Sequence, residues 1–210
     1  AFIDSAAQKY YPDKWLAAGT ATSVADIKTT VETDNLIVSI FSLAAVGIII
    51  LLTFRSLSLP ILLVAVIQIA IWINMGVPYF TGSSLVFIGY LVIKSLQLGA
   101  TIDYAILLTN RYMDFRLQHA PKEAAALALR AAGGSVLPSA MILSLAGYAE
   151  GLMSKIDAIS TIGMLLGRGA ALSGILVLTL LPVLLTVLDP VIMATTMGTK
   201  TIRHKKKGVA

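Results

Sequence analysis

Long stretches of the chain carry no charged residue, and the polar positions are concentrated between them. Lys, Arg, Asp and Glu are absent from residues 35–54, 56–93, 131–149 and 169–188. A helix needs about 20 apolar residues to cross the hydrocarbon core of a bilayer. Three of these runs therefore match one span each, and the run 56–93 is too long for a single span. We expect an all-α membrane protein that crosses the bilayer several times.

The pattern predicts five spans. Residues 75–84 hold two glycines, one proline and two aromatic residues, and such a composition is typical of a short interfacial loop that would divide the long run. Pro60 lies in the first turn of the second span, where proline costs a helix little. The predicted spans are about 35–54, 57–76, 87–110, 135–153 and 167–188.

The segments between and around the spans are more polar. Residues 1–34 are too few to bury a core and are expected to be the end of a larger extracytoplasmic domain. Within them, a capping box at Ser23 predicts a helix that continues toward Asp34, after a weak strand and turn at residues 15–19. Residues 111–130 are predicted as an interfacial helix, and residues 155–166 either connect two spans or extend the fifth. Residues 191–210 form a basic tail.

The composition agrees with a bilayer environment and excludes several chemistries. Hydrophobic residues make up 57% and charged residues 13% of the 210 positions, against about 45–50% and about 25% in soluble domains. No cysteine occurs, which excludes disulfides and thiolate chemistry. His119 and His204 have no neighbouring ligands for a metal ion, and no Walker-type phosphate loop is present. We expect no enzyme activity and no cofactor.

Basic residues near the ends of the spans predict the orientation. Cytoplasmic loops carry an excess of Lys and Arg, and five spans place ten such residues on one side and four on the other. We therefore expect an extracytoplasmic amino end and a cytoplasmic carboxyl end in the cell membrane. The net charge of +5 then reflects topology, and no nucleic-acid partner is expected. The ten are Arg55, Arg111, Arg116, Lys122, Arg130, Lys200, Arg203, Lys205, Lys206 and Lys207, and the four are Lys9, Lys14, Lys28 and Lys155.

Four ionisable residues lie within or beside the predicted spans. Such a side chain costs about 2.5–3.5 kcal/mol at the centre of a span. Lys94 can extend its charged end to the interface, and Glu150 and Arg168 lie near the outer ends of their spans. Asp103 differs, because it lies eight residues before Arg111, or about 12 Å along a helix. A short carboxylate at that depth cannot reach water.

The neighbours of Asp103 form a polar cluster. Gly99, one turn away, leaves room for another helix to approach closely, and Tyr104, Gln97 and Thr101 share the adjacent face. Desolvation destabilises an ionised carboxyl, and hydrogen bonds or a nearby cation restore it. This setting suits a group that takes up and releases a proton. The alternative is a buried acid that only sets the register between helices.

The stretch 97–112 resembles the Gly-x-x-x-Asp-Tyr…Arg-Tyr signature of the MMPL (mycobacterial membrane protein large) family, within the RND (resistance–nodulation–division) superfamily. Further segments match the family in order along nearly the whole chain. These segments are Gly19…Asp26…Asp34, Phe54-Arg55-Ser56, residues 132–139 ending in Ser139, Gly163-x-x-x-Gly167, and Leu181-Pro182.

The resemblance implies an architecture. Transporters of this family consist of two similar repeats, each with one helix, an extracytoplasmic porter domain and five more helices in a bundle like a sterol-sensing domain. This chain would supply the end of one porter domain, at residues 1–34, and the five helices that follow. The form of its Asp-Tyr segment and the basic tail resemble the second repeat. We therefore expect the carboxyl-terminal half, helices eight to twelve, with the amino-terminal half as its partner, in a possible oligomer.

The resemblance also implies a function, namely proton-driven export of lipids, amphiphiles or hydrophobic drugs. Asp103 would accept the proton and Tyr104 would be its hydrogen-bonding partner, each facing the counterpart pair of the other half. Gly99, Ala100 and Ser139 would support this relay. The alternative is a non-transporting membrane module of the same architecture, either a lipid or sterol sensor or an assembly partner.

Overall fold

The computed structural model describes residues 20–82 and 87–196. The chain divides into two compact units, Ala1–Phe41 and Ser42–Ala210. Of the first unit, the structure describes the beginning of helix α2 (Thr20–Phe54), where most side chains from residue 36 onward are exposed. The second unit contains the rest of α2 and the helices discussed below.

Helices account for the described part of the chain, apart from short connections. Five of them are long and apolar enough to cross a membrane, which confirms the prediction of an all-α protein with five spans. Within residues 20–82 and 87–196 the only β-type pairing is an isolated bridge between Ser56 and Thr196. After α2 the helices are α3 (Ser58–Thr81), α4 (Phe87–Arg116), α5 (Pro121–Met153), α6 (Asp157–Val187) and α7 (Asp189–Thr195).

Two segments between the spans differ from the predictions. The interfacial helix predicted at 111–130 does not form, because α4 continues to Arg116 and α5 begins at Pro121, where proline is well tolerated in a first turn. The loop predicted at 75–84 was also wrong over most of its length. Helix α3 continues through Pro78 to Thr81 and ends at Gly82, which takes the left-handed conformation (φ 65°) common after helices.

The other boundaries are extended in a similar way. Residues 157–166 extend the fifth span, because α6 begins at Asp157. The helix predicted from Ser23 begins at Thr20 and continues into the first span, so the boundary predicted between residues 34 and 35 falls inside α2. The strand predicted at 15–19 and the end of the basic tail from residue 197 lie outside the described residues.

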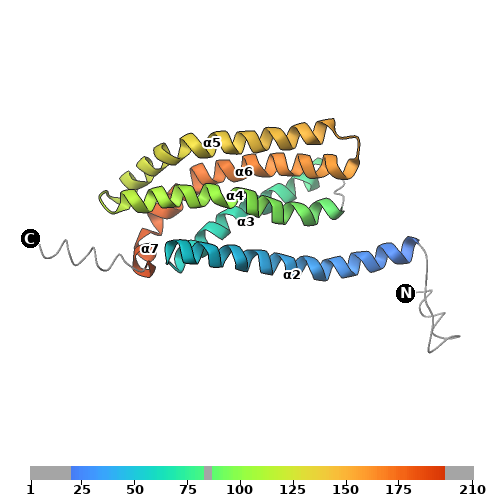
Figure 1. Cartoon of the computed structure of the whole chain (residues 1–210), viewed down its shortest axis with the longest axis horizontal. Helices are drawn as coiled ribbons and strands as arrows, with labels where there is room; N and C mark the ends of the chain where they lie inside the picture. The colour runs from blue at the N-terminus through green and yellow to red at the C-terminus, as the bar shows by residue number, and fades with distance from the viewer. Residues whose placement is uncertain (1–19, 83–86, 197–210) are drawn as a thin grey trace, which may run out of the picture. The chain divides into compact units, whose positions relative to one another are not determined.

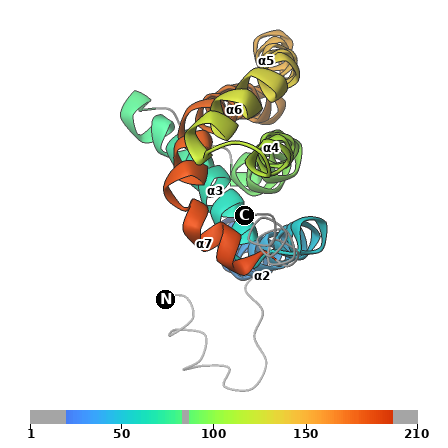
Figure 2. The same ribbon diagram turned by 90° about the vertical axis from the view of Figure 1, so that its left-hand side faces the viewer.

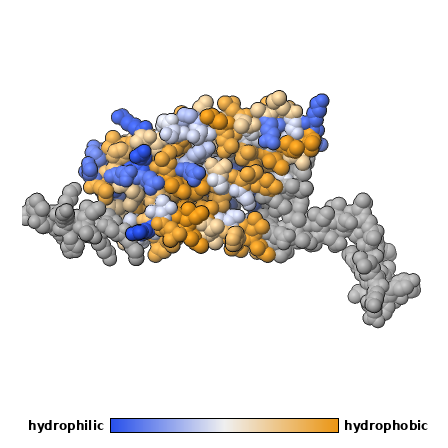
Figure 3. All heavy atoms as spheres, viewed as in Figure 1, coloured by the Kyte–Doolittle hydropathy of each residue, from blue (hydrophilic) through white to orange (hydrophobic). Residues whose placement is uncertain are grey.

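Helix α6 is the central element of the second unit. It packs against α3, α4, α5 and α7, and Figures 1 and 2 show α5 and α6 running side by side with α4 beside them. In Figure 3 hydrophobic residues dominate the middle of the visible surface, and hydrophilic residues gather mainly toward the two ends of these helices. This distribution is the one expected for a bundle surrounded by lipid.

The connection between α2 and α3 is tight and is held by α7. Arg55 takes a left-handed conformation (φ 49°), which is uncommon for a residue with a side chain, and its N–H donates to the Leu51 carbonyl at 2.8 Å. The next residues then meet α7, where the hydroxyls of Ser58 and Thr195 lie 2.7 Å apart. The carboxyl-terminal end of the bundle is thereby joined to the start of α3.

Glycines allow α5 and α6 to approach until their backbones touch. A Cβ atom on Gly147 would lie 2.5 Å from the backbone nitrogen of Gly167, and one on Gly163 would lie 2.6 Å from that of Gly151. Small residues of this kind are typical of helix contacts in membranes, where close packing and hydrogen bonds drive association. The Gly163-x-x-x-Gly167 motif is therefore half of a packing seam, and Gly147 and Gly151 form the other half.

Replacing a glycine of this seam with alanine should separate the two helices. We expect Gly147→Ala to lower the free energy of unfolding by about 1–3 kcal/mol, as overpacking does in protein cores, measured as a lower midpoint of thermal unfolding in detergent. Gly133→Ala in the same helix is the matched control, because no atom lies within 4 Å of its added Cβ and alanine favours helix by up to about 1 kcal/mol. Equal midpoints for both variants would contradict the seam.

Candidate functional site

Asp103 lies in the middle of α4. Along the helix axis it is about 24 Å from Phe87 and about 20 Å from Arg116. Its side chain is exposed in the described chain, and it makes no hydrogen bond or ion pair with another described residue. The carboxyl group thus points away from the helices of its own unit.

The face of α4 around Asp103 is open. Gly99 is exposed, and a Cβ placed on it would meet no atom within 4 Å. Leu96 and Asn110, at helical spacing from Asp103, are exposed as well, and Ala100 is half-buried. Within the described chain no side chain fills the space beside Gly99, and the role predicted for Gly99 and Ala100 stays a prediction.

Tyr104 and Ser139 lie in different surroundings. The Tyr104 side chain is buried and lies close enough to Asp103 for an electrostatic interaction between the two side chains. No hydrogen bond among the described residues joins the two side chains. Ser139 is exposed on α5, next to the buried Ala140, and no hydrogen bond among the described residues connects it to the relay pair. The roles predicted for these two residues stay predictions.

The buried face of α4 carries a hydrogen-bonded pair of amides. Asn74 of α3 and Gln97 of α4 are both completely buried, and the Asn74 Nδ2 group donates to Gln97 Oε1 at 2.8 Å. The same Asn74 group donates to the Leu165 carbonyl at 2.9 Å, and Gln97 Nε2 donates to Ser173 Oγ at 3.2 Å. Side chains from α3 and α4 are therefore both satisfied by α6.

Two residues of α6 complete this amide cluster. A Cβ on Gly169 would collide with the Gln97 amide, so glycine leaves the space that the amide occupies, and Gln97 Nε2 donates to the Gly169 carbonyl at 3.2 Å. Arg168 donates from Nε to Asn74 Oδ1 at 2.8 Å and from Nη2 to the Asn74 carbonyl at 3.1 Å. The amide cluster thus consists of Asn74, Gln97, Arg168, Gly169 and Ser173.

A second polar cluster lies at the end of α4 near Arg116. Its guanidinium makes a two-pronged ion pair with the carboxylate of Asp189, from Nε to Oδ1 at 2.8 Å and from Nη2 to Oδ2 at 2.9 Å. The Tyr112 hydroxyl donates to the same Oδ1 at 2.7 Å. Such charge-assisted bonds are among the strongest in proteins, and this one fastens the end of α4 to the start of α7.

Sequence reasoning noted parts of these clusters but not their partners. Gln97 belonged to the predicted polar cluster around Asp103, and Tyr112 to the family signature. Arg116 counted only toward the orientation, whereas Asn74 and Asp189 were missed. The available signals were a lone amide within an apolar run at Asn74 and the first charge after the run 169–188 at Asp189.

The electrostatics of Asp189 follow from this geometry. Burial on its own raises the pKa of the Asp189 carboxyl, but the hydrogen bonds from Arg116 and Tyr112 outweigh burial and hold that pKa below its ordinary value. Asp189 is therefore ionised at neutral pH. Among the described residues, no group of three or more His, Asp and Glu side chains is arranged to hold a metal ion.

The comparison with known families is consistent with this arrangement. The model of the MMPL family matches residues 6–207. The chain belongs to the MMPL family. Its apolar helices and its family identify it as a multi-pass membrane protein. No solved structure gives a significant match.

The chain resembles several curated proteins. A Streptomyces coelicolor chain named as a membrane protein is 30% identical over 81% of this chain and 25% of its own length. The apo-petrobactin exporter of Bacillus anthracis is 32% identical over 56% of this chain and 17% of its own length. The transport protein MmpL12 of Mycobacterium tuberculosis is 28% identical over 80% of this chain and 15% of its own length. The chain thus spans a quarter or less of the length of these relatives.

Within this MMPL chain, the amide cluster predicts a stability effect. Gln97→Met removes the amide at nearly constant volume, and with it the hydrogen bonds to Asn74, to the Gly169 carbonyl and to Ser173. We expect the midpoint of thermal unfolding in detergent to fall by an amount equivalent to about 1 kcal/mol, the scale of hydrogen bonds between membrane helices. The control is Gln118→Met, at an exposed position in the turn after α4, and a similar loss there would argue against the cluster.

The ion pair of Asp189 predicts a pH-dependent effect. Asp189→Asn leaves the Arg116 charge uncompensated and should lower the free energy of unfolding by about 3–5 kcal/mol at neutral pH. Because the pKa of Asp189 is lowered by folding, its contribution is present above the ordinary carboxyl pKa and is lost as the pH falls below about 4. The difference in the midpoint of thermal unfolding between the native and variant proteins should be smaller at pH 3 than at pH 7. A constant difference would contradict the pairing.

Proposed function

We propose that this MMPL chain forms part of an exporter in the cell membrane that is driven by the proton motive force and moves lipids, amphiphiles or hydrophobic drugs. The observation that carries the proposal is the position of Asp103, halfway along a membrane helix and on its open face. Two relatives are named as an exporter and a transport protein, which supports transport over a purely sensing role.

The proposed mechanism depends on the charge of Asp103. An ionised carboxylate in a span is costly unless a cation or hydrogen bonds compensate it, and the described chain offers neither. We infer that the compensation comes from outside this unit, from the counterpart pair of the other transporter half. Protonation removes the charge and allows the open face of α4 to pack differently, and deprotonation reverses this change. Tyr104 would contribute its hydroxyl to the proton pathway.

The contacts on the other faces of α4 would transmit this movement. Gln97 ties α4 to α6 at Gly169, and Arg116 ties α4 to α7 at the end of the helix. A shift of α4 relative to the other half would therefore move the helices of this unit together. In the proposed topology the amino end is extracytoplasmic, so that the movement would reach the porter domain through α2.

Substituting Asp103 tests the proposal. Asp103→Asn keeps the shape and removes the titration, and we expect proton-driven efflux to fall to the background level. Full-length protein in liposomes would be given a pH gradient, with the hydrophobic dye Nile red as cargo and an enclosed pH dye to report proton flux. Thermal unfolding of the full-length variant in detergent would show that it keeps its fold.

Asp114→Asn is the matched control, since Asp114 is exposed on the same helix closer to its end. This variant should keep both the proton flux and the dye efflux. Undiminished coupled efflux by Asp103→Asn would remove Asp103 from the mechanism. Absence of any proton-coupled efflux in the native protein, together with altered partner binding by Asp103→Asn, would favour the non-transporting module.

A further inference from the structure

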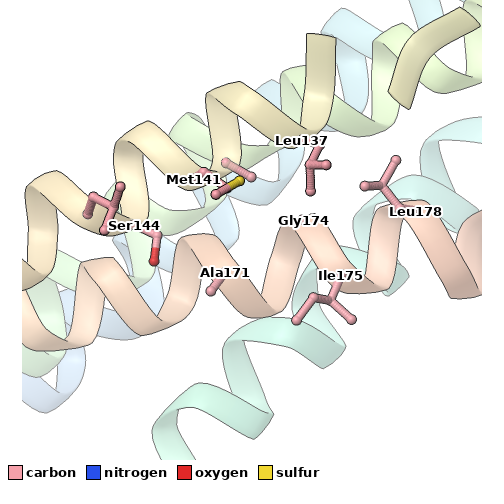
Figure 4. A pocket seen from close by; sticks show the side chains of 9 residues that line it. Leu137, Met141, Ser144, Ala171, Gly174, Ile175 and Leu178 are labelled. Atoms are coloured by element: carbon pink, nitrogen blue, oxygen red, sulfur yellow. The ribbon is translucent and has the colours of Figure 1, made fainter. Parts of the chain in front are cut away.

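The two helices of the glycine seam diverge on one side and leave an apolar groove. It has a volume of about 330 Å³ and is lined by both helices, including Met141 and Leu145 of α5 and Ala171 and Ile175 of α6. Figure 4 shows Met141, Ala171 and Ile175 along the two neighbouring helices. Met141, Leu145 and Ile175 are each more than half exposed (54%, 65% and 59%). The groove therefore opens on the surface of this unit.

Arg168 does not line the groove itself, but it lies about one helical turn beyond the lining residue Ala171. Arg168 precedes Ala171 by three residues and Ile175 by seven, so the three share one stripe of α6. On α5, Tyr148 lies at the same level, because a Cβ on Gly167 would be 2.8 Å from the backbone nitrogen of Tyr148. Tyr148 is also close enough to interact electrostatically with the guanidinium. The groove thus has a polar end and an apolar length.

The guanidinium of Arg168 has donors to spare. Asn74 accepts from Nε and Nη2, and both acceptors belong to a neutral residue. No carboxylate among the described residues pairs with Arg168, and Nη1 is not among the buried atoms without a partner. The positive charge is therefore uncompensated within the described chain, and Nη1 is accessible from the surface.

The backbone of Arg168 lies about 8 Å inside the hydrocarbon, within reach of lipid head groups for a side chain of this length. Helix α6 has 31 residues and is about 46 Å long, against about 30 Å of hydrocarbon, so a centred helix extends about 8 Å beyond it at each end. Arg168 lies about 16 Å from the first residue, Asp157. Side chains of helices lean toward the amino end, which allows its charged group to reach the boundary between hydrocarbon and head groups.

We propose that the groove between α5 and α6 binds an anionic phospholipid, with the phosphate at Arg168 and Tyr148 and one acyl chain along Met141, Ala171 and Ile175. The lipid enters sideways from the leaflet on the side of the α5–α6 turn. Arginine is suited to phosphate because its planar donors can bind two oxygens. The apolar length of the groove selects a lipid over a free anion.

Lipid binding to the full-length protein in detergent tests the proposal, measured by native mass spectrometry. Phosphatidylglycerol and phosphatidylcholine with identical acyl chains are compared. We expect the native protein to bind phosphatidylglycerol more tightly than phosphatidylcholine. Arg168→Gln should lower the affinity for phosphatidylglycerol about five- to tenfold, the scale of one cation near a lipid surface. Arg168→Lys should retain part of the preference. Ala171→Phe fills the groove and should reduce the binding of both lipids.

Each variant has a matched control. Lys155→Gln removes an exposed cation on the same side of the bundle and should leave the preference intact, and Ile142→Phe adds the same ring on an exposed face away from the groove. Thermal unfolding identifies any variant that has lost its fold. If Arg168→Gln does not fold, the lipid binding of Arg168→Lys and Ala171→Phe tests the proposal. An unchanged preference in Arg168→Gln, or the absence of a preference in the native protein, overturns the proposal. Competition by inorganic phosphate as effective as by the lipid would also overturn it.

Discussion

The hydrogen-bonded amides of Asn74 and Gln97 fix the positions of α3 and α4 along α6. In a bilayer, apolar side chains are as well placed against lipid as against each other, so helices associate through close packing and hydrogen bonds. An amide buried there has no water to replace a missing partner. Because the pair bonds to α6 through Leu165, Gly169 and Ser173, sliding any one of three helices would break several bonds at once. The positions of α3 and α4 along α6 follow from this requirement.

The remaining contacts of α6 act at other depths and by other means. On one side its glycines allow α5 to approach until the backbones touch, a contact that works through dispersion and shape. At its end, the ion pair between Arg116 and Asp189 holds α4 and α7 together, where water is near and charges are less costly. Together these contacts hold the five helices from α3 through α7 in one unit. They occupy every face of α4 except the one that carries Asp103.

The fold could be predicted because charge is so costly in lipid that its absence marks the spans. For the same reason Asp103 was recognisable as exceptional. The ends of the helices were harder, since residues 111–130 form helix equally well in the interface or as extensions of the spans, and only the pairing of Arg116 with a residue 73 positions away favours the longer α4. Asn74 escaped notice because a neutral amide does not interrupt a run without charges. Its importance depends on Gln97 and Arg168, which only the packing brings near.

Asp103 and Arg168 differ in the length of their side chains and in their depth in the membrane. These two properties decide which groups can balance each charge. Arg168 is long, leans toward the nearer surface and rests on Asn74, so its charge can be met by a lipid phosphate at the boundary of the hydrocarbon. Asp103 is short, lies about 20 Å or more from either end of α4, and has no partner among the described residues. A lipid head group cannot reach it, and water can do so only through the protein. We propose that its charge is balanced by another part of the full-length protein or removed by a proton. A site in which both can happen would have the two states that proton coupling requires.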